Sequence, residues 1–168
     1  ARIDVFGVLT HRGVMEMETS NYLQGYQDIA RKFEAALADP NVHAILLNMD
    51  SPGGEVSGAF DLAARIFAAR GQKPIHAVAS DTMASAAYLI GSAANKIHVT
   101  PTASVGSIGV VMRHVDLSAA LADDGIKVTH IYAGAHKVDG NPFEALPDSV
   151  RANFQREINA LYSMFVDA

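Results

Sequence analysis

The 168-residue sequence predicts a single layered α/β domain with a mostly parallel sheet. Short β-rich runs alternate along the chain with amphipathic helical patterns, which is typical of strands joined by crossover helices. The strand-like runs are also continuously apolar, as in residues 44–47, and buried parallel strands have this composition. Apolar residues make up 49% of the chain and charged residues 18%, so we expect a globular core.

The elements follow in order from these patterns. A strand is expected over residues 3–9, and helical spacing of apolar residues predicts a helix over 22–37, which stops before Asp39-Pro40. An apolar strand over 43–49 leads through a glycine turn into a helix over 56–69, whose end near Gly71 suits a C-cap. The next pair is expected to be a strand over 75–79 and an alanine-rich helix over 84–93.

The remaining elements complete the alternation. We expect strands over 97–99, 107–112 and 128–132, and helices over 118–122 and 149–166. The last helix has an apolar face, which we expect to lie against a partner subunit in a homo-oligomeric ring. That face consists of Phe154, Ile158, Leu161, Tyr162 and Phe165.

Composition excludes several classes of function. The net charge of -5 and the absence of a basic block argue against a nucleic-acid partner. The absence of cysteine excludes disulfides, a thiolate nucleophile and thiolate metal sites. No apolar stretch reaches the roughly 20 residues that span a bilayer. Because the chain opens on a strand and stops in a helical pattern, we expect 1–168 to be one domain excised or processed from a longer chain.

Two segments carry the features of a catalytic site. In residues 50–56 a strand leads into Pro-Gly-Gly, which directs backbone amides toward the carboxyl ends of the strands, although a plain turn has the same residues. In residues 83–88, Ser85 follows a strand at the expected start of a helix, between small residues. The amide of Ala86 then lies beside an accessible hydroxyl, as an oxyanion donor would. Helix capping by Ser85 is the simpler interpretation of that segment taken alone.

These two segments in this order resemble the Clp protease and signal peptide peptidase A families of serine proteases, and the resemblance covers nearly the whole chain. It implies a Clp-protease/crotonase-like fold, with Ser85 as the nucleophile and Gly54 and Ala86 as the oxyanion hole. Where the family commonly has Gly-Gly after the serine, this chain has Ala86-Ala87, which narrows that space.

The base distinguishes the two families. Residues 131–137 resemble the SGxxK segment of signal peptide peptidase A, which implies Lys137 as the general base, and residues 106–110 match a GS(L/I)GV segment whose serine, Ser107, holds the lysine. A lysine serves as a base only where desolvation lowers its pKa from about 10.4. The resemblance therefore implies a Ser/Lys dyad, with no cofactor and no metal.

Other interpretations use the seven histidines and the carboxylates. A Ser-His-Asp protease would take His114 or His136 as base, with Asp116 or Asp139 to orient it. A crotonase-type acyl-CoA enzyme would need a carboxylate beside the oxyanion hole, and a non-catalytic ring subunit would tolerate loss of the dyad. No pair of histidines has the spacing of metal ligands.

Residues 137–143 resemble the phage and prophage branch of the family, the head-maturation proteases. This resemblance implies a serine endopeptidase that cleaves a capsid assembly or scaffold protein in the cytoplasm of a bacterial host. The alternative is a membrane-associated signal peptide peptidase. In either case the expected partner is a polypeptide substrate bound in an extended conformation.

Overall fold

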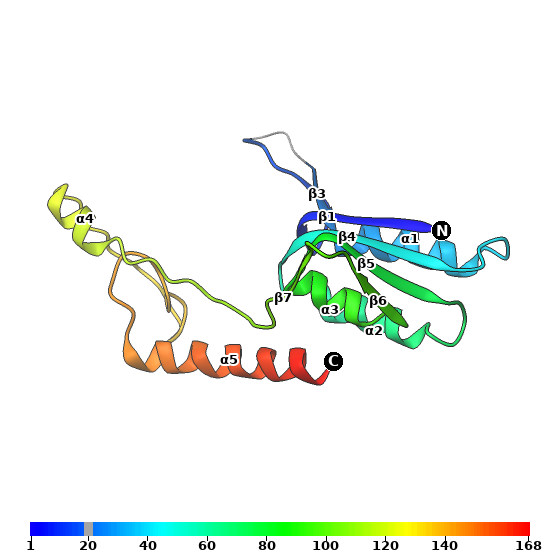
Figure 1. Cartoon of the computed structure of the whole chain (residues 1–168). Helices are drawn as coiled ribbons and strands as arrows, with labels where there is room; N and C mark the ends of the chain where they lie inside the picture. Colours follow the sequence, from blue (N-terminus) through cyan, green and yellow to red (C-terminus); the bar gives the residue numbers. More distant parts are fainter. Residues whose placement is uncertain (19–21) are drawn as a thin grey trace. The chain divides into compact units, whose positions relative to one another are not determined.

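The computed structural model describes residues 1–18 and 22–168, which form two compact units (Figure 1). Unit 1 consists of Ala1–Gly109 and Met164–Ala168, and unit 2 consists of Val110–Ser163. That the whole chain acts as one protease domain stays a prediction.

Unit 1 contains a mostly parallel sheet in the order β2-β3-β1-β4-β5-β6, with β7 also paired to β5. The neighbours β1–β3, β1–β4, β4–β5, β5–β6 and β5–β7 are parallel, and only the short β2–β3 pair among the described strands is antiparallel. The predicted α/β class with a mostly parallel sheet is confirmed. The strands are β1 (Arg2–Thr10), β2 (Val14–Met15), β3 (Tyr22–Gly25), β4 (Ile45–Gly54), β5 (Ile75–Ala84), β6 (Lys96–Val99) and β7 (Ser104–Gly106).

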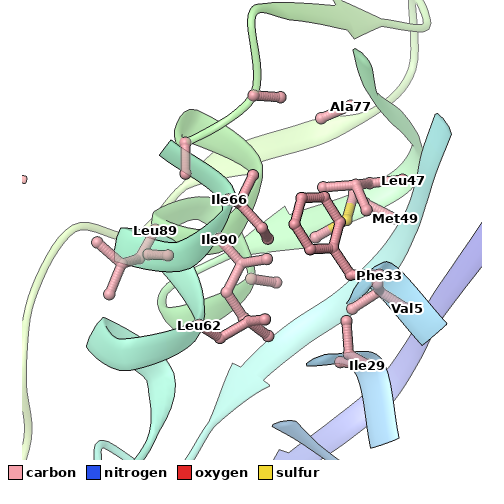
Figure 2. Packing of buried hydrophobic residues seen from close by; sticks show 14 of the residues in the cluster. Val5, Ile29, Phe33, Leu47, Met49, Leu62, Ile66, Ala77, Leu89 and Ile90 are labelled. Carbon is pink, nitrogen blue, oxygen red and sulfur yellow. The ribbon is translucent and has the colours of Figure 1, made fainter. Parts of the chain in front are cut away.

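One face of this sheet holds the core. Side chains alternate in the first part of β4 and β5, so that over residues 45–50 and 75–78 every second residue is buried while its neighbours are half-buried. Three helices supply the other half of the core, and Figure 2 shows Phe33 beside Leu47 and Met49, with Ile66 and Ile90 packed nearby. These helices are α1 (Tyr26–Ala38), α2 (Ala59–Ala68) and α3 (Ala86–Ser92).

The beginning of α1 corrects the predicted helix over 22–37, because residues 22–25 form strand β3 instead. The carboxylate of Asp28 accepts hydrogen bonds from the Gly25 N–H (3.2 Å) and from the Tyr22 hydroxyl, so the chain is fixed at this point. The Tyr26 hydroxyl donates to the Glu55 carbonyl (2.6 Å), and burial raises the pKa of that phenol. This bond ties α1 to the segment that follows β4.

The predicted strands over 107–112 and 128–132 are wrong. Neither range forms a strand, and the strand near the first of them is β7, which ends at Gly106. β-branched composition favours an extended backbone, but a strand also needs a neighbour to accept and donate its hydrogen bonds. The other predicted elements are present, with β4 and β5 running five residues further than expected, to Gly54 and Ala84.

Unit 2 contains α4 (Ser118–Asp123) and most of α5 (Asp148–Asp167). The Leu117 N–H donates to the Pro142 carbonyl (2.8 Å), and the His114 ring lies 3.0 Å from the Asn141 carbonyl oxygen. Two segments distant in sequence are therefore joined here. Across the described ranges 1–18 and 22–168, no helix has the length and hydropathy needed to cross a membrane.

Candidate active site

The Pro-Gly-Gly segment lies at the end of β4, inside the sheet rather than in a loop after it. Gly53 has a φ of +99°, which L-residues rarely adopt. Gly54 packs directly on the backbone of Leu9, whose carbonyl oxygen occupies the place a Cβ would need. Both glycines are therefore required by the backbone itself.

Ser85 lies where β5 ends and α3 begins, as the sequence predicts. It is half-buried, and its backbone has φ 52° and ψ -125°, outside the regions that non-glycine residues favour. It occupies the N-cap position of α3, but its side chain makes no capping hydrogen bond. The simpler interpretation of this serine, as a helix cap, therefore does not hold. A strained backbone that presents an unused hydroxyl is typical of a nucleophile turn.

The two turns meet at Gly53. A Cβ built on Gly53 would lie 2.8 Å from the Ser85 Cβ and 2.9 Å from the Ala86 nitrogen. The Pro-Gly-Gly turn is thus in van der Waals contact with the start of α3. The resemblance to the two protease families, which implies that Gly54 and Ala86 form one oxyanion hole, also implies this meeting.

Two backbone amides are available at this meeting point. The Glu55 N–H donates to the Leu9 carbonyl of β1 (2.9 Å). Because successive N–H groups of an extended chain point to opposite sides, the Gly54 N–H points away from β1. The N–H of Ala86 is the first of α3, where no preceding helical carbonyl exists to accept it. Donors beside a free hydroxyl are the arrangement that acyl transfer requires.

Ser107 lies next to Ser85 through the backbone. The Ser85 N–H donates to the Gly106 carbonyl (2.8 Å), and Ala84 pairs with Gly106 in the β5–β7 ladder. Ser107 has a φ of +54°, and it and Ser85 are the two non-glycine residues of the described chain with positive φ. The structure therefore brings together Ser85, Ala86, Gly54 and Ser107 in unit 1.

Lys137 belongs to unit 2. Its N–H donates to the Gly134 carbonyl (3.2 Å) within a turn, and its side chain is exposed. The adjacent His136 pairs through Nδ1 with Asp139 Oδ2 at 2.9 Å. The segment over residues 135–140 is a turn and not an extended strand.

The remaining histidines include a pair that lies in the sheet. His76 and His98 stack on β5 and β6 with ring centroids 5.2 Å apart, and His76 Nδ1 lies 2.9 Å from His98 Nε2. In the described part of the chain, no group of three or more His, Cys, Asp or Glu side chains is placed to hold a metal ion.

The Ser118 hydroxyl, which donates to Asp116, holds the pKa of that carboxyl below its usual range.

Sequence reasoning missed two residues of this site, Gly53 and Ser51. It assigned the second glycine to the oxyanion hole and took the first for a turn residue, whereas Gly53 is the residue against Ser85. Ser51 is fully buried. The sequence does contain a signal for Ser51. Proline cannot donate a backbone hydrogen bond, so a serine directly before it can supply a donor in its place.

Comparison with known proteins adds to this geometry. A model of peptidase family S49 matches residues 68–168. The chain is 46% identical to the head-tail preconnector protein GP5 of Enterobacteria phage P21, over 99% of this chain and 33% of that protein. It is 45% identical to capsid assembly protease C of Escherichia phage lambda, over 98% of this chain and 37% of that protein. It thus spans about a third of the length of these relatives.

Among solved structures, the 1510-N membrane-bound stomatin-specific protease, determined in complex with a substrate peptide, matches 95% of this chain and 57% of its own. The TM-score is 0.50 and the sequence identity 19%, so this likeness concerns the fold. The predicted Clp-protease/crotonase-like α/β fold is confirmed.

Proposed function

This chain belongs to peptidase family S49, and from that premise we propose that it is a serine endopeptidase with Ser85 as nucleophile and Lys137 as general base. The resemblance to signal peptide peptidase A and to its phage branch is in line with the relatives in phages P21 and lambda. Ser107 is proposed to hold the lysine, and the Gly54 and Ala86 amides to bind the oxyanion.

The observation that carries the proposal is the backbone of Ser85. A φ of 52° costs about 1–3 kcal/mol for a non-glycine residue, and the hydroxyl it presents makes no cap for α3. Strain of this kind persists where the fold imposes it, here through the Gly106 carbonyl on one side and Gly53 on the other. Positioning a nucleophile beside oxyanion donors is a function that accounts for both features.

In the proposed reaction Ser85 Oγ forms a bond to the peptide carbonyl carbon while Lys137 takes its proton. The carbonyl oxygen becomes an oxyanion held by the Gly54 and Ala86 amides. When the C–N bond breaks, Lys137 returns the proton to the leaving amine. Water then attacks the acyl-enzyme and loses a proton to Lys137. When the ester C–O bond breaks, Lys137 returns that proton to Ser85 Oγ, and the second product leaves with a new carboxyl end.

The proposed substrate is a capsid assembly or scaffold protein of a phage, bound in an extended conformation. Support comes from the names of the relatives, a capsid assembly protease and a head-tail preconnector protein. The proposal places the 168 residues as one protease domain in a homo-oligomeric ring, acting in the cytoplasm of a bacterial host. Cleavage of signal peptides at a membrane is the alternative substrate.

The test is cleavage of reduced, unfolded casein by the purified chain beside Ser85→Ala and Lys137→Ala. We expect both variants to lose at least about 1,000-fold in kcat, because nucleophile and base act as a unit. If both variants cleave casein as fast as the parent, the proposal of a Ser/Lys dyad is wrong.

A second candidate mechanism rests on the His136–Asp139 pair, which has the geometry of an imidazole oriented by a carboxylate. His136→Ala separates the two. The Ser/Lys mechanism predicts a change in kcat of less than about 10-fold, whereas a Ser-His-Asp mechanism predicts about a 10,000-fold loss. The matched variant Asp139→Asn should change kcat in the same direction as His136→Ala under either mechanism.

A further inference from the structure

Ser51 has an unusual environment. Among the described residues it is the polar side chain with no exposed area at all, and Thr10, 8% exposed, is the other buried one. A buried hydroxyl is costly unless it is hydrogen-bonded. Ser51 Oγ donates to the Gly7 carbonyl (2.7 Å) and accepts from the Gly53 N–H (3.1 Å), so both of its roles are used.

These two hydrogen bonds compensate for an irregular register between β1 and β4. Phe6 pairs with Asp50 and Val8 pairs with Gly53, so β4 has one residue more than β1 in this stretch. Ser51 and Pro52 together lie opposite Gly7, and Pro52 has no N–H to offer the neighbouring strand. The Ser51 hydroxyl supplies the missing donor to Gly7 and holds the Gly53 amide at the same time.

Gly53 is the residue that contacts the nucleophile. A Cβ at Gly53 would lie 2.8 Å from the Ser85 Cβ and 2.9 Å from the Ala84 carbonyl oxygen. Any rotation of Gly53 would therefore change the position of the Gly54 N–H relative to Ser85, since the two glycines share a peptide plane. Ser51 also pairs with Met83 in β5, two residues before Ser85.

We propose that Ser51 is a positioning residue of the active site: its buried hydroxyl locks Gly53, and thereby aims the Gly54 amide at the oxyanion formed on attack by Ser85. This inference rests on the proposed peptidase function. The bond between Ser51 and Gly53 acts on the transition state and not on the bound peptide, because the oxyanion exists only after attack.

The experiment compares Ser51→Ala with Ser80→Ala. Ser80 is a matched control, because its hydroxyl also donates to a carbonyl of β4, that of Met49 (3.2 Å), but it is exposed and distant in register from Gly53. We expect Ser51→Ala to lower kcat on casein by about 10- to 100-fold while KM changes less than about twofold. Ser80→Ala should retain parent kcat. Ser51→Thr, which keeps the hydroxyl, should recover part of the loss.

Hydrogen exchange gives a readout that does not depend on activity. Ser51→Ala should speed exchange of the Gly53 N–H at least about 10-fold, with no change in the β4 amides over 45–49. If exchange of the Gly53 N–H is unchanged in Ser51→Ala, the positioning role is overturned. It is also overturned if kcat and KM fall together and backbone amides generally lose their protection from exchange. If the parent cleaves nothing but Gly53 exchange rises, the peptidase proposal fails while the hold of Ser51 on Gly53 stands.

Discussion

At the scale of single residues, the site is built from backbone positions that tolerate few side chains. Gly53 is constrained twice, by its φ of +99° and by the backbone atoms of Ala84 and Ala86 within 3 Å of where a Cβ would be. These atoms belong to the end of β5 and the start of α3, so they cannot move without moving the nucleophile. The first of the two glycines therefore sets how close the turns can approach.

Gly53→Ala should accordingly lose activity and stability together. We expect a fall in kcat of at least about 100-fold, because displacement of reacting groups by about 1 Å has that effect, and a free energy of unfolding lower by roughly 1–3 kcal/mol. Casein cleavage and urea unfolding measure the two.

The control for this variant is Gly71→Ala. A Cβ at Gly71 would meet nothing within 4 Å, so activity and stability should stay near those of the parent. Equal activity of Gly53→Ala and the parent would contradict the contact between the two turns.

At the scale of elements, α1 begins where Asp28 fixes the chain. Its carboxylate accepts from the Tyr22 hydroxyl and the Gly25 N–H and pairs with Arg31, and the Tyr22 hydroxyl is the largest cause that holds the pKa of Asp28 below 3.8. These contacts explain why residues 22–25 form β3 although their apolar spacing continues that of the helix.

Replacing Asp28 by alanine should destabilise unit 1 by about 1 kcal/mol at neutral pH. Because the folded-state pKa is lowered, the ionised carboxylate contributes stability above the ordinary pKa of 3.8, and this contribution is lost as the pH falls through the folded value. The difference in unfolding free energy between parent and variant should therefore be constant above about pH 5 and shrink below pH 3.8.

Asp61→Ala is the matched control, since Asp61 also lies in the first turn of a helix, α2, and is exposed. It should show a smaller loss of stability, of the few tenths of a kcal/mol typical of a charge near a helix N-terminus. A loss for Asp28→Ala that persists unchanged to pH 2 would show that its carboxylate is not the stabilising group.

The helices are held on the sheet by large buried side chains, of which Phe33 is 1% exposed and lies beside Leu47 and Met49 (Figure 2). Phe33→Ala should lower the free energy of unfolding by about 3–5 kcal/mol through lost burial and a cavity. Phe67→Ala, at a position 52% exposed in α2, should cost less than half as much. Urea denaturation followed by circular dichroism compares them, and equal losses would contradict the core described for unit 1.

At the scale of the whole molecule, apolar residues are distributed unevenly. The buried cluster that includes Phe33 consists of residues of unit 1, whereas in unit 2 Val111 is 88% exposed and Ile131 98% exposed. The range 128–132 contains the β-branched residues that predict a strand, but no backbone hydrogen bond is made by its amides within the described chain.

Hydrogen exchange of the parent protein tests this contrast. Amides over 45–49 and 75–79 should be the slowest to exchange, because these central strands are paired on both sides, and amides over 128–132 should be among the fastest. The control is to measure the same exchange rates over a hundredfold range of protein concentration, which detects contacts between copies of the chain. Protection of 128–132 that disappears on dilution would mean that this range pairs as a strand with another copy of the chain.

The amino-acid sequence predicts the α/β class, the order of most elements and the position of Ser85 at a strand-to-helix turn. These follow from local periodicity and from short motifs, which are encoded by neighbouring residues. It also identified Gly54, Ala86, Ser107 and Lys137 as candidates, through resemblance to a family. Ser107 proved to be joined to Ser85 by one backbone hydrogen bond, at Gly106.

The contact between Gly53 and the nucleophile, and the hydrogen bond from Gly53 to Ser51, depend on how distant segments pack and could not be predicted from local patterns. The extra residue of β4 relative to β1 is a property of two strands whose facing residues, such as Gly7 and Ser51, are 44 positions apart, and it creates the need for the Ser51 hydroxyl. Likewise, the strands expected over 107–112 and 128–132 were not formed, because their residues favour an extended backbone but cannot provide the neighbouring strand. Local sequence specifies conformation, whereas register and pairing depend on which distant segments meet.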